Sequence, residues 1–116
     1  KETCYMGGWI IPPQITLAGK VKPNIKPKKN TLNDINYDKF KILMAHAYFI
    51  KSVKEAKELL YSTLEPKKIK NYDVHLIDMK FIKKYYYPAA FVQSKHISDI
   101  EGKINKNDIY TKNYGL

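Results

Sequence analysis

The stretch YDKFKILMAHAYFIKSVKEAKELLYSTL, residues 37–64, decides the fold that the sequence predicts. Polar residues that commonly cap helices fill positions 31–36 ahead of it, and Pro66 follows it. Its apolar residues recur at the three-to-four-residue spacing of a buried helix face: Phe40, Leu43, Ala47, Ile50, Val53, Ala56, Leu59 and Leu60. We therefore expect one long helix from about Tyr37 to about Leu64.

A second, shorter helix is expected over residues 73–87. Asp73 can cap it after the basic turn at 65–72, and Pro88 ends it. The inward stripe would then consist of Val74, Ile77, Phe81 and Tyr85. A strand that places His75, Ile77, Met79 and Phe81 on one face remains the alternative for this segment.

The two ends of the chain differ in composition from this helical part. Residues 1–30 hold four prolines and several glycines, a composition that excludes a helix and disfavours a central strand. Ile10–Ile11 and Ile15–Leu17 could pair briefly as edge strands. The sequence thus predicts a mainly α fold: a helical core at 31–92 flanked by an extended arm at 1–30 and an irregular tail at 93–116.

Composition narrows the class of function. The chain has 116 residues and a net charge of +10, and all 21 of its basic residues are lysine. Such an excess of one sign repels itself unless a polyanion neutralises it, so we expect a nucleic-acid partner. The longest apolar run, Ile42–Ile50, is too short to span a bilayer.

No catalytic or metal-binding constellation stands out. The soft ligands Cys4, His46, His75 and His96 are too widely separated for a compact zinc pattern. Gly7–Gly8 lacks the lysine and hydroxyl that end a phosphate-binding loop. We expect a protein that is not an enzyme and that needs no cofactor, metal or small-molecule substrate.

Three lysine clusters with neighbouring tyrosines remain as the candidate RNA-binding residues. Lysine neutralises phosphates as a mobile point charge, which suits recognition of the RNA backbone, and tyrosine can stack on unpaired bases. The clusters comprise an acid-free extended segment, a turn and the end of the second helix: Lys20, Lys22, Lys26, Lys28 and Lys29; Lys67, Lys68, Lys70 and Tyr72; and Lys80, Lys83 and Lys84. A solvated surface is the alternative interpretation of each cluster.

The apolar middle of the long helix suggests a second hypothesis. Ile42–Ile50 is apolar almost all round, more than a two-helix protein would cover by itself. A protein-interaction subunit of another complex would dock there through Leu43, Ala47, Tyr48 and Ile50. A third hypothesis, attachment to an anionic membrane surface, is disfavoured because the lysines lie in arms and turns and not along one helix face.

A short stretch resembles a known family. Gly8-Trp9, Pro13-Gln14-Ile15-Thr16 and Lys20-Val21-Lys22-Pro23 with Ile25 resemble the extended segment of the mitochondrion-specific large-subunit ribosomal protein family numbered forty-one, and Tyr114-Gly115 is similar to a later family motif. Gln14 stands where that family has aspartate, and Asn24 where it has tyrosine. The resemblance implies a structural constituent of the organellar large subunit, laid along ribosomal RNA among neighbouring proteins.

The cysteine content, the first residue and the resemblance together indicate a cellular compartment. A single cysteine allows no disulfide within the chain, which favours a reducing environment. A start at Lys1 fits a cleaved organellar presequence. With the resemblance, these features favour the mitochondrial matrix, with the cytoplasm as the alternative.

Overall fold

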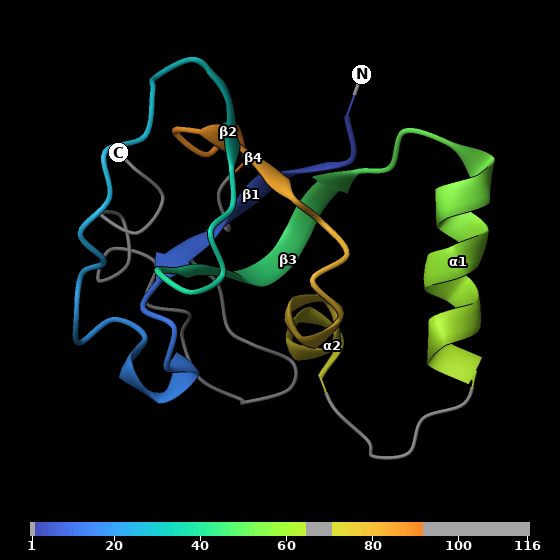
Figure 1. Ribbon diagram of the computed structural model, residues 1–116, viewed down its shortest axis with the longest axis horizontal. Coiled ribbons are helices and arrows are strands. Elements are labelled where there is room, and N and C mark those ends of the chain that lie inside the picture. The colour runs from blue at the N-terminus through green and yellow to red at the C-terminus, as the bar shows by residue number, and fades with distance from the viewer. Residues whose placement is uncertain (1, 65–70, 92–116) are drawn as a thin grey trace.

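Four strands form one mixed sheet within residues 2–64 and 71–91, the part of the chain that the computed structural model describes (Figure 1). The order across the sheet is β2-β4-β1-β3; β1 pairs with β3 antiparallel and with β4 parallel, and β2 pairs with β4 antiparallel. In chain order the elements are β1 (Cys4–Ile11), a 3₁₀ turn (Ile15–Leu17), β2 (Thr31–Asp34), β3 (Lys41–Phe49), α1 (Val53–Leu64), α2 (Tyr72–Met79) and β4 (Lys84–Tyr87).

The predicted mainly α fold is wrong, because the first half of the expected long helix is strand β3. Residues 41–49 lie beside β1, with Ile42 opposite Ile10 and Tyr48 opposite Tyr5. The apolar run around Ile42–Ile50 reflects a strand that has apolar neighbours on both of its faces. Because all residues of this run except His46 are apolar, it has no polar side that would distinguish a helix from such a strand.

Helix α1 begins where the sequence carries a capping box. The Ser52 hydroxyl accepts a hydrogen bond from the Glu55 amide at 3.2 Å, and the Glu55 carboxylate faces the same hydroxyl at 3.5 Å. The Ser52 side chain thus satisfies the Glu55 amide, which has no partner within the helix, and so stabilises the first turn of α1. Lys51 forms an ion pair with Glu55, four residues later, at 3.7 Å.

The expected helix at 73–87 divides into α2 and β4. Lys80 adopts a left-handed conformation, with φ of 51°, directly after Met79 and so ends α2. Four residues later the chain pairs with β1, and Tyr85 lies opposite Tyr5. The helix prediction therefore holds only as far as Met79. The strand alternative is wrong for His75 to Phe81, the residues it placed on one face, because the strand lies later, at 84–87.

Strand β1 lies inside the sheet, so residues 1–30 are not the extended arm that the composition predicted. Its register against β3 shifts around Gly7, and Gly8 has a φ of 145° that favours glycine. The shift brings Ile10 to the same core as Tyr5. The prolines that argued against a strand all follow Ile11, outside β1. The predicted tail at 93–116 lies outside the described residues.

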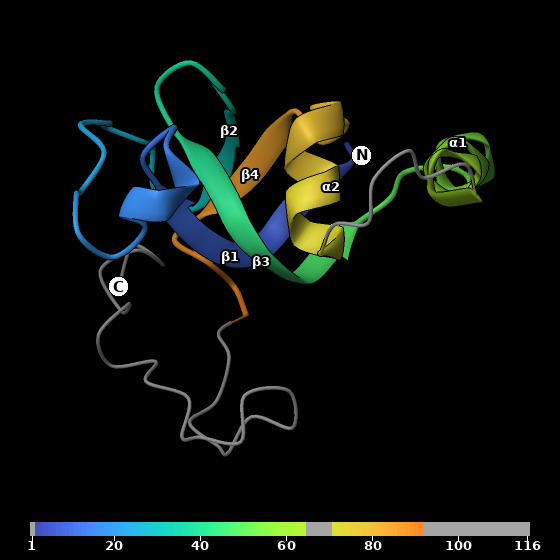
Figure 2. The same ribbon diagram turned by 90° about the horizontal axis from the view of Figure 1, so that it is seen from below.

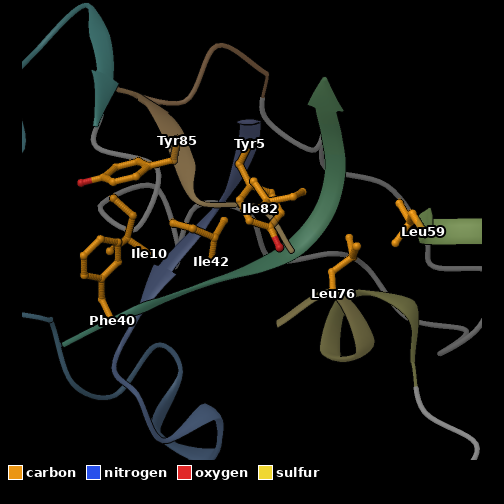
Figure 3. Packing of buried hydrophobic residues seen from close by; sticks show 8 residues of the cluster. All are labelled: Tyr5, Ile10, Phe40, Ile42, Leu59, Leu76, Ile82 and Tyr85. Atoms are coloured by element: carbon orange, nitrogen blue, oxygen red, sulfur yellow. The ribbon is translucent and has the colours of Figure 1, made fainter. Parts of the chain in front are cut away.

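The main core lies between the sheet and α2 (Figures 2 and 3). Leu76 of α2 packs with Tyr5 and Ile82, and all three side chains are fully buried. Phe40 meets Tyr85 edge-on, with ring centroids 5.4 Å apart. A smaller cluster around Trp9 and Ile11 forms with partly buried residues such as Ile15 and Leu43.

Helix α1 stands to one side of the sheet (Figures 1 and 2). Leu59 is its single buried residue and belongs to the main core with Leu76. Ser62 also contacts His75 of α2, with 3.1 Å between Oγ and Nε2. The other apolar side chains of α1 are exposed.

Candidate nucleic-acid interface

Residues 20–29 form an extended segment whose lysines point outward. We call Lys20, Lys22, Lys26, Lys28 and Lys29 the lysine row; all five are exposed. Between residues 22 and 28 burial alternates, and the half-buried positions are Pro23, Ile25 and Pro27. Extended backbone sends successive side chains to opposite sides in this way. Within the segment the Ile25 amide donates to the Pro23 carbonyl at 3.2 Å, which forms a tight turn at Asn24.

Two contacts attach the lysine row to the folded part of the chain. Ile25 packs against the main core. The Asn33 carboxamide of β2 accepts a hydrogen bond from the Lys28 amide at 2.9 Å and donates one to the Lys28 carbonyl at 3.0 Å. Asn33 thus pairs with Lys28 as a neighbouring strand would, and it holds the backbone of the row extended along the edge of β2.

The electrostatics of the row suit a phosphate backbone. Residues 20–29 contain no acidic side chain, so no carboxylate of the segment itself competes for the lysines. Residues two apart in extended chain are about 6–7 Å from each other. Lys26 and Lys28 therefore present two cations from one side of a pre-formed segment, with Lys22 four residues before Lys26.

The second predicted cluster is only partly visible. Lys67, Lys68 and Lys70 lie outside the described residues. Tyr72 begins α2 and is 41% exposed, but its hydroxyl lies 2.9 Å from that of Tyr48. The two rings tilt against each other with centroids 6.3 Å apart. Tyr72 is therefore engaged within the protein and presents only part of its ring for stacking.

The third predicted cluster is split by the fold. Lys80 and Lys83 are exposed near the end of α2, whereas Lys84 lies in β4 and pairs with Asp34 of β2 at 2.7 Å. The hydrogen bond to Asp34 raises the pKa of Lys84 and helps join the two strands. Tyr85, which follows, is buried in the main core and is therefore not available to stack on a base.

The four residues that the protein-interaction hypothesis named do not form one surface in the structure. Leu43 packs beside Trp9 and Ile11, and Ile50 packs against the main core. Tyr48 also packs against the main core, and both it and Ala47 border an open groove on the sheet. Because these residues belong largely to a strand, the proposed docking through an apolar long helix loses its structural basis.

The groove is the feature that sequence reasoning missed. It has a volume of about 640 Å³ and an almost entirely apolar lining. The lining comes from the segment before β1, from strands β1 to β4 and from the segment after β4: Glu2, Cys4, Met6, Leu32, Ala47, Tyr48, Phe49, Tyr86 and Phe91. These residues are spread over ninety positions, so no local pattern could have identified them.

The single cysteine lies at the start of strand β1. Cys4 is buried, and desolvation together with the nearby Glu2 raises the pKa of its thiol. Its sulfur lies 3.6 Å from that of Met6. Within residues 2–64 and 71–91, no group of three or more His, Cys, Asp or Glu side chains could hold a metal ion.

The helices within the same ranges are also too short or too polar to cross a membrane. Comparisons with protein-family models, curated proteins and solved structures found no significant match to this chain.

Proposed function

We propose that this protein is a non-catalytic constituent of a ribonucleoprotein and that it binds the RNA backbone through the lysine row. The observation that carries the proposal is the alternation in residues 22–28, where Pro23, Ile25 and Pro27 turn inward and the lysines turn to solvent. A segment held in this way presents its charges without first having to be ordered.

The lysine-only composition favours backbone contact over base reading. A bidentate guanidinium is the commonest reader of guanine edges, and the chain has none. Lysine ammonium groups tolerate variation in phosphate position, which suits a structural role on folded RNA. Lys80 and Lys83 add two further exposed cations at the end of α2.

The cellular context of the proposal rests on the resemblance alone. The stretch similar to the mitochondrion-specific ribosomal family runs from Gly8 in β1, through the 3₁₀ turn, to Ile25 of the extended segment. On that basis the assembly is the mitochondrial ribosome large subunit, the compartment is the matrix, and the partners are ribosomal RNA and neighbouring proteins.

The test compares two triple variants of equal charge. In the first, Lys22, Lys26 and Lys28 are changed to alanine; in the matched control, the exposed Lys39, Lys51 and Lys54 are changed instead. Affinity for a structured RNA is measured over a series of salt concentrations. For the first variant the slope of log K against log salt should fall by about 2, since each phosphate contact contributes roughly 0.7–0.9.

The control variant should keep most of the slope of the unmodified protein, because its lysines lie outside the row. Equal losses in the two variants would attribute binding to net charge and remove the role of the row. RNA affinity that does not change with salt would contradict the proposal as a whole.

A further inference from the structure

The apolar groove lies on the face of the sheet opposite to α2 (Figure 2). Tyr5 and Tyr85 point into the core beside α2, whereas their neighbours Cys4 and Tyr86 line the groove. Cys4 lies opposite Phe49 of β3, and Phe49 is 41% exposed. A continuous apolar surface that extends across four strands is typical of a binding site.

The chain that follows β4 is attached at this groove. Pairing of β4 with β1 ends at Tyr5, and the carbonyl of the next residue, Met6, accepts hydrogen bonds from the amides of Ala90 and Phe91 at 2.8 and 3.2 Å. Strand β1 is one of the two inner strands, and the side chains of Met6 and Phe91 both line the groove. Residue 92 therefore continues from the middle of the groove and not from an edge of the sheet.

The chain beyond Phe91 is long enough to cross the groove, since 25 residues follow it. Neighbouring strands are about 4.8 Å apart, so β3 lies about 5 Å and β2 about 10 Å from β1. Six residues of extended chain span up to about 20 Å. Ile97 and the residues after it can thus reach Phe49 of β3 or Leu32 of β2.

The composition of residues 92–116 suits contact with an apolar surface better than contact with RNA. This segment holds four lysines and three acidic residues, so it carries only one of the ten net positive charges of the chain. Its first half contains Ile97, Ile100 and Ile104, each separated from the next by polar or small residues. Isoleucine is among the residue types most often buried in folded proteins.

We propose that residues 92–104 bind in the groove of their own chain, and that Ile97, Ile100 and Ile104 cover its apolar lining. A groove of about 640 Å³ is comparable to the roughly 300–1,000 Å³ of pockets for drug-sized ligands, so several side chains of one segment fill it. Tethering at Phe91 gives the segment an effective concentration on the order of millimolar. A separate partner molecule would have to compete with that concentration.

Occupation of the groove has a consequence for β2, the short outer strand that holds the lysine row. Leu32 lies opposite Tyr86, and both side chains line the groove. The next residue, Asn33, makes the two hydrogen bonds to the Lys28 backbone. A segment that covers Leu32 therefore stabilises β2 together with the attachment of the row. This effect is a property of the free protein and does not depend on RNA binding.

The first test locates the segment in the full-length chain without RNA. A nitroxide spin label is attached to Ser98→Cys, while Cys4 can remain because it is only 4% exposed. We expect the NMR signals of the Leu32 and Tyr86 amides to lose most of their intensity. The matched control carries the label at Lys57→Cys on the exposed side of α1, and these two signals should then be retained.

The spin label also distinguishes the chain's own segment from that of a second copy. Isotope-labelled protein without the nitroxide is mixed with nitroxide-labelled protein that carries no isotope, so any signal loss arises between molecules. The proposal predicts no loss at Leu32 and Tyr86 in this mixture. Losses in the mixture, or full signals when Ser98→Cys is labelled within the same chain, would overturn the proposal.

Substitutions within the segment test which side chains cover the groove. Ile97→Asp with Ile100→Asp should raise the fluorescence of an added apolar dye several-fold and speed hydrogen exchange at Leu32, with unchanged circular dichroism. Asn105→Asp with Asn107→Asp is the matched control, because it adds the same two charges outside residues 92–104 and should change neither measurement. Equal effects of the two variants would show that added charge, and not loss of the isoleucines, is the cause, and would overturn the assignment.

Discussion

The hydroxyl of Thr3 connects the beginning of β1 to the beginning of α1. It donates to the Glu55 carboxylate at 3.1 Å and accepts from the Lys51 amide at 3.0 Å, although about fifty residues separate these positions in the chain. Thr3 itself is 7% exposed. This one side chain thus attaches the otherwise lightly packed helix to the sheet.

Replacing Thr3 by valine should therefore destabilise the protein locally. The change keeps the shape of the side chain but leaves the Lys51 amide without this acceptor, at a cost of about 1–3 kcal/mol. Hydrogen exchange should show faster exchange in the first turn of α1 than in β1. Thr31→Val, a half-buried strand position, is the matched control and should leave α1 protected.

Asn33 offers a way to disturb the lysine row without changing its charge. Asn33→Ala removes both hydrogen bonds to the Lys28 backbone, so the row must be ordered when RNA binds. We expect faster proteolysis within 20–29 and a several-fold weaker RNA affinity with little change in salt slope. Asn36→Ala, which removes only the turn contact to the Asp38 amide, should affect neither measurement.

Two tyrosines should respond in opposite ways to the loss of their hydroxyls. The Tyr5 hydroxyl is buried and has no hydrogen-bond partner among the described residues, so Tyr5→Phe should leave the free energy of unfolding unchanged or raise it by up to about 1 kcal/mol. Tyr37 donates to the Ile82 carbonyl, so Tyr37→Phe should lower that free energy by about 0.5–1.5 kcal/mol. Urea denaturation measures the free energy of unfolding of both variants. Equal effects of the two substitutions would contradict the difference in hydrogen bonding between the two hydroxyls.

Buried tyrosines should also make the protein sensitive to alkali. Burial raises the pKa of Tyr37 and of Tyr85 to about 12, from the usual value near 10, and also raises the pKa of Tyr5. The folded state therefore keeps protons that the unfolded state releases above pH 10. This contribution to stability is complete below about pH 10 and is lost as the pH rises toward 12.

The measurement is Trp9 fluorescence and tyrosinate absorbance followed through the same pH titration. Trp9 is 8% exposed, so its emission reports the packing around it. Tyrosinate should appear together with unfolding. Ionisation of all ten tyrosines near pH 10 in a protein that remains folded would contradict the burial of Tyr5, Tyr37 and Tyr85.

Local sequence patterns mark the ends of only some of the helices and strands. The Ser52–Glu55 capping box was present in the sequence and would have placed the start of α1 at Val53, but the apolar periodicity of Phe40 to Ile50 outweighed it. Pro88 correctly limited the last element, since β4 ends at Tyr87. The left-handed Lys80 that separates α2 from β4 has no comparable signal, because lysine rarely adopts that conformation.

The candidate RNA-binding site also combines features that the sequence predicts with contacts that only the structure shows. The lysines of 20–29 and the absence of acids among them are properties of the sequence itself, and the structure adds that Ile25 and Asn33 hold the segment extended. The roles of Tyr72 and Tyr85 could not be predicted, because their partners Tyr48 and Phe40 are distant in sequence.

By itself the sequence determined the excess positive charge, the acid-free lysine row and the amount of apolar surface that must be buried. These depend only on which side chains are present and on their nearest neighbours in the chain. The tertiary structure alone decided that 41–49 is a strand, that β1 lies inside the sheet, and that residues from all four strands line one apolar groove. Strand pairing and burial are set by contacts between residues far apart in sequence, and no local pattern contains that information.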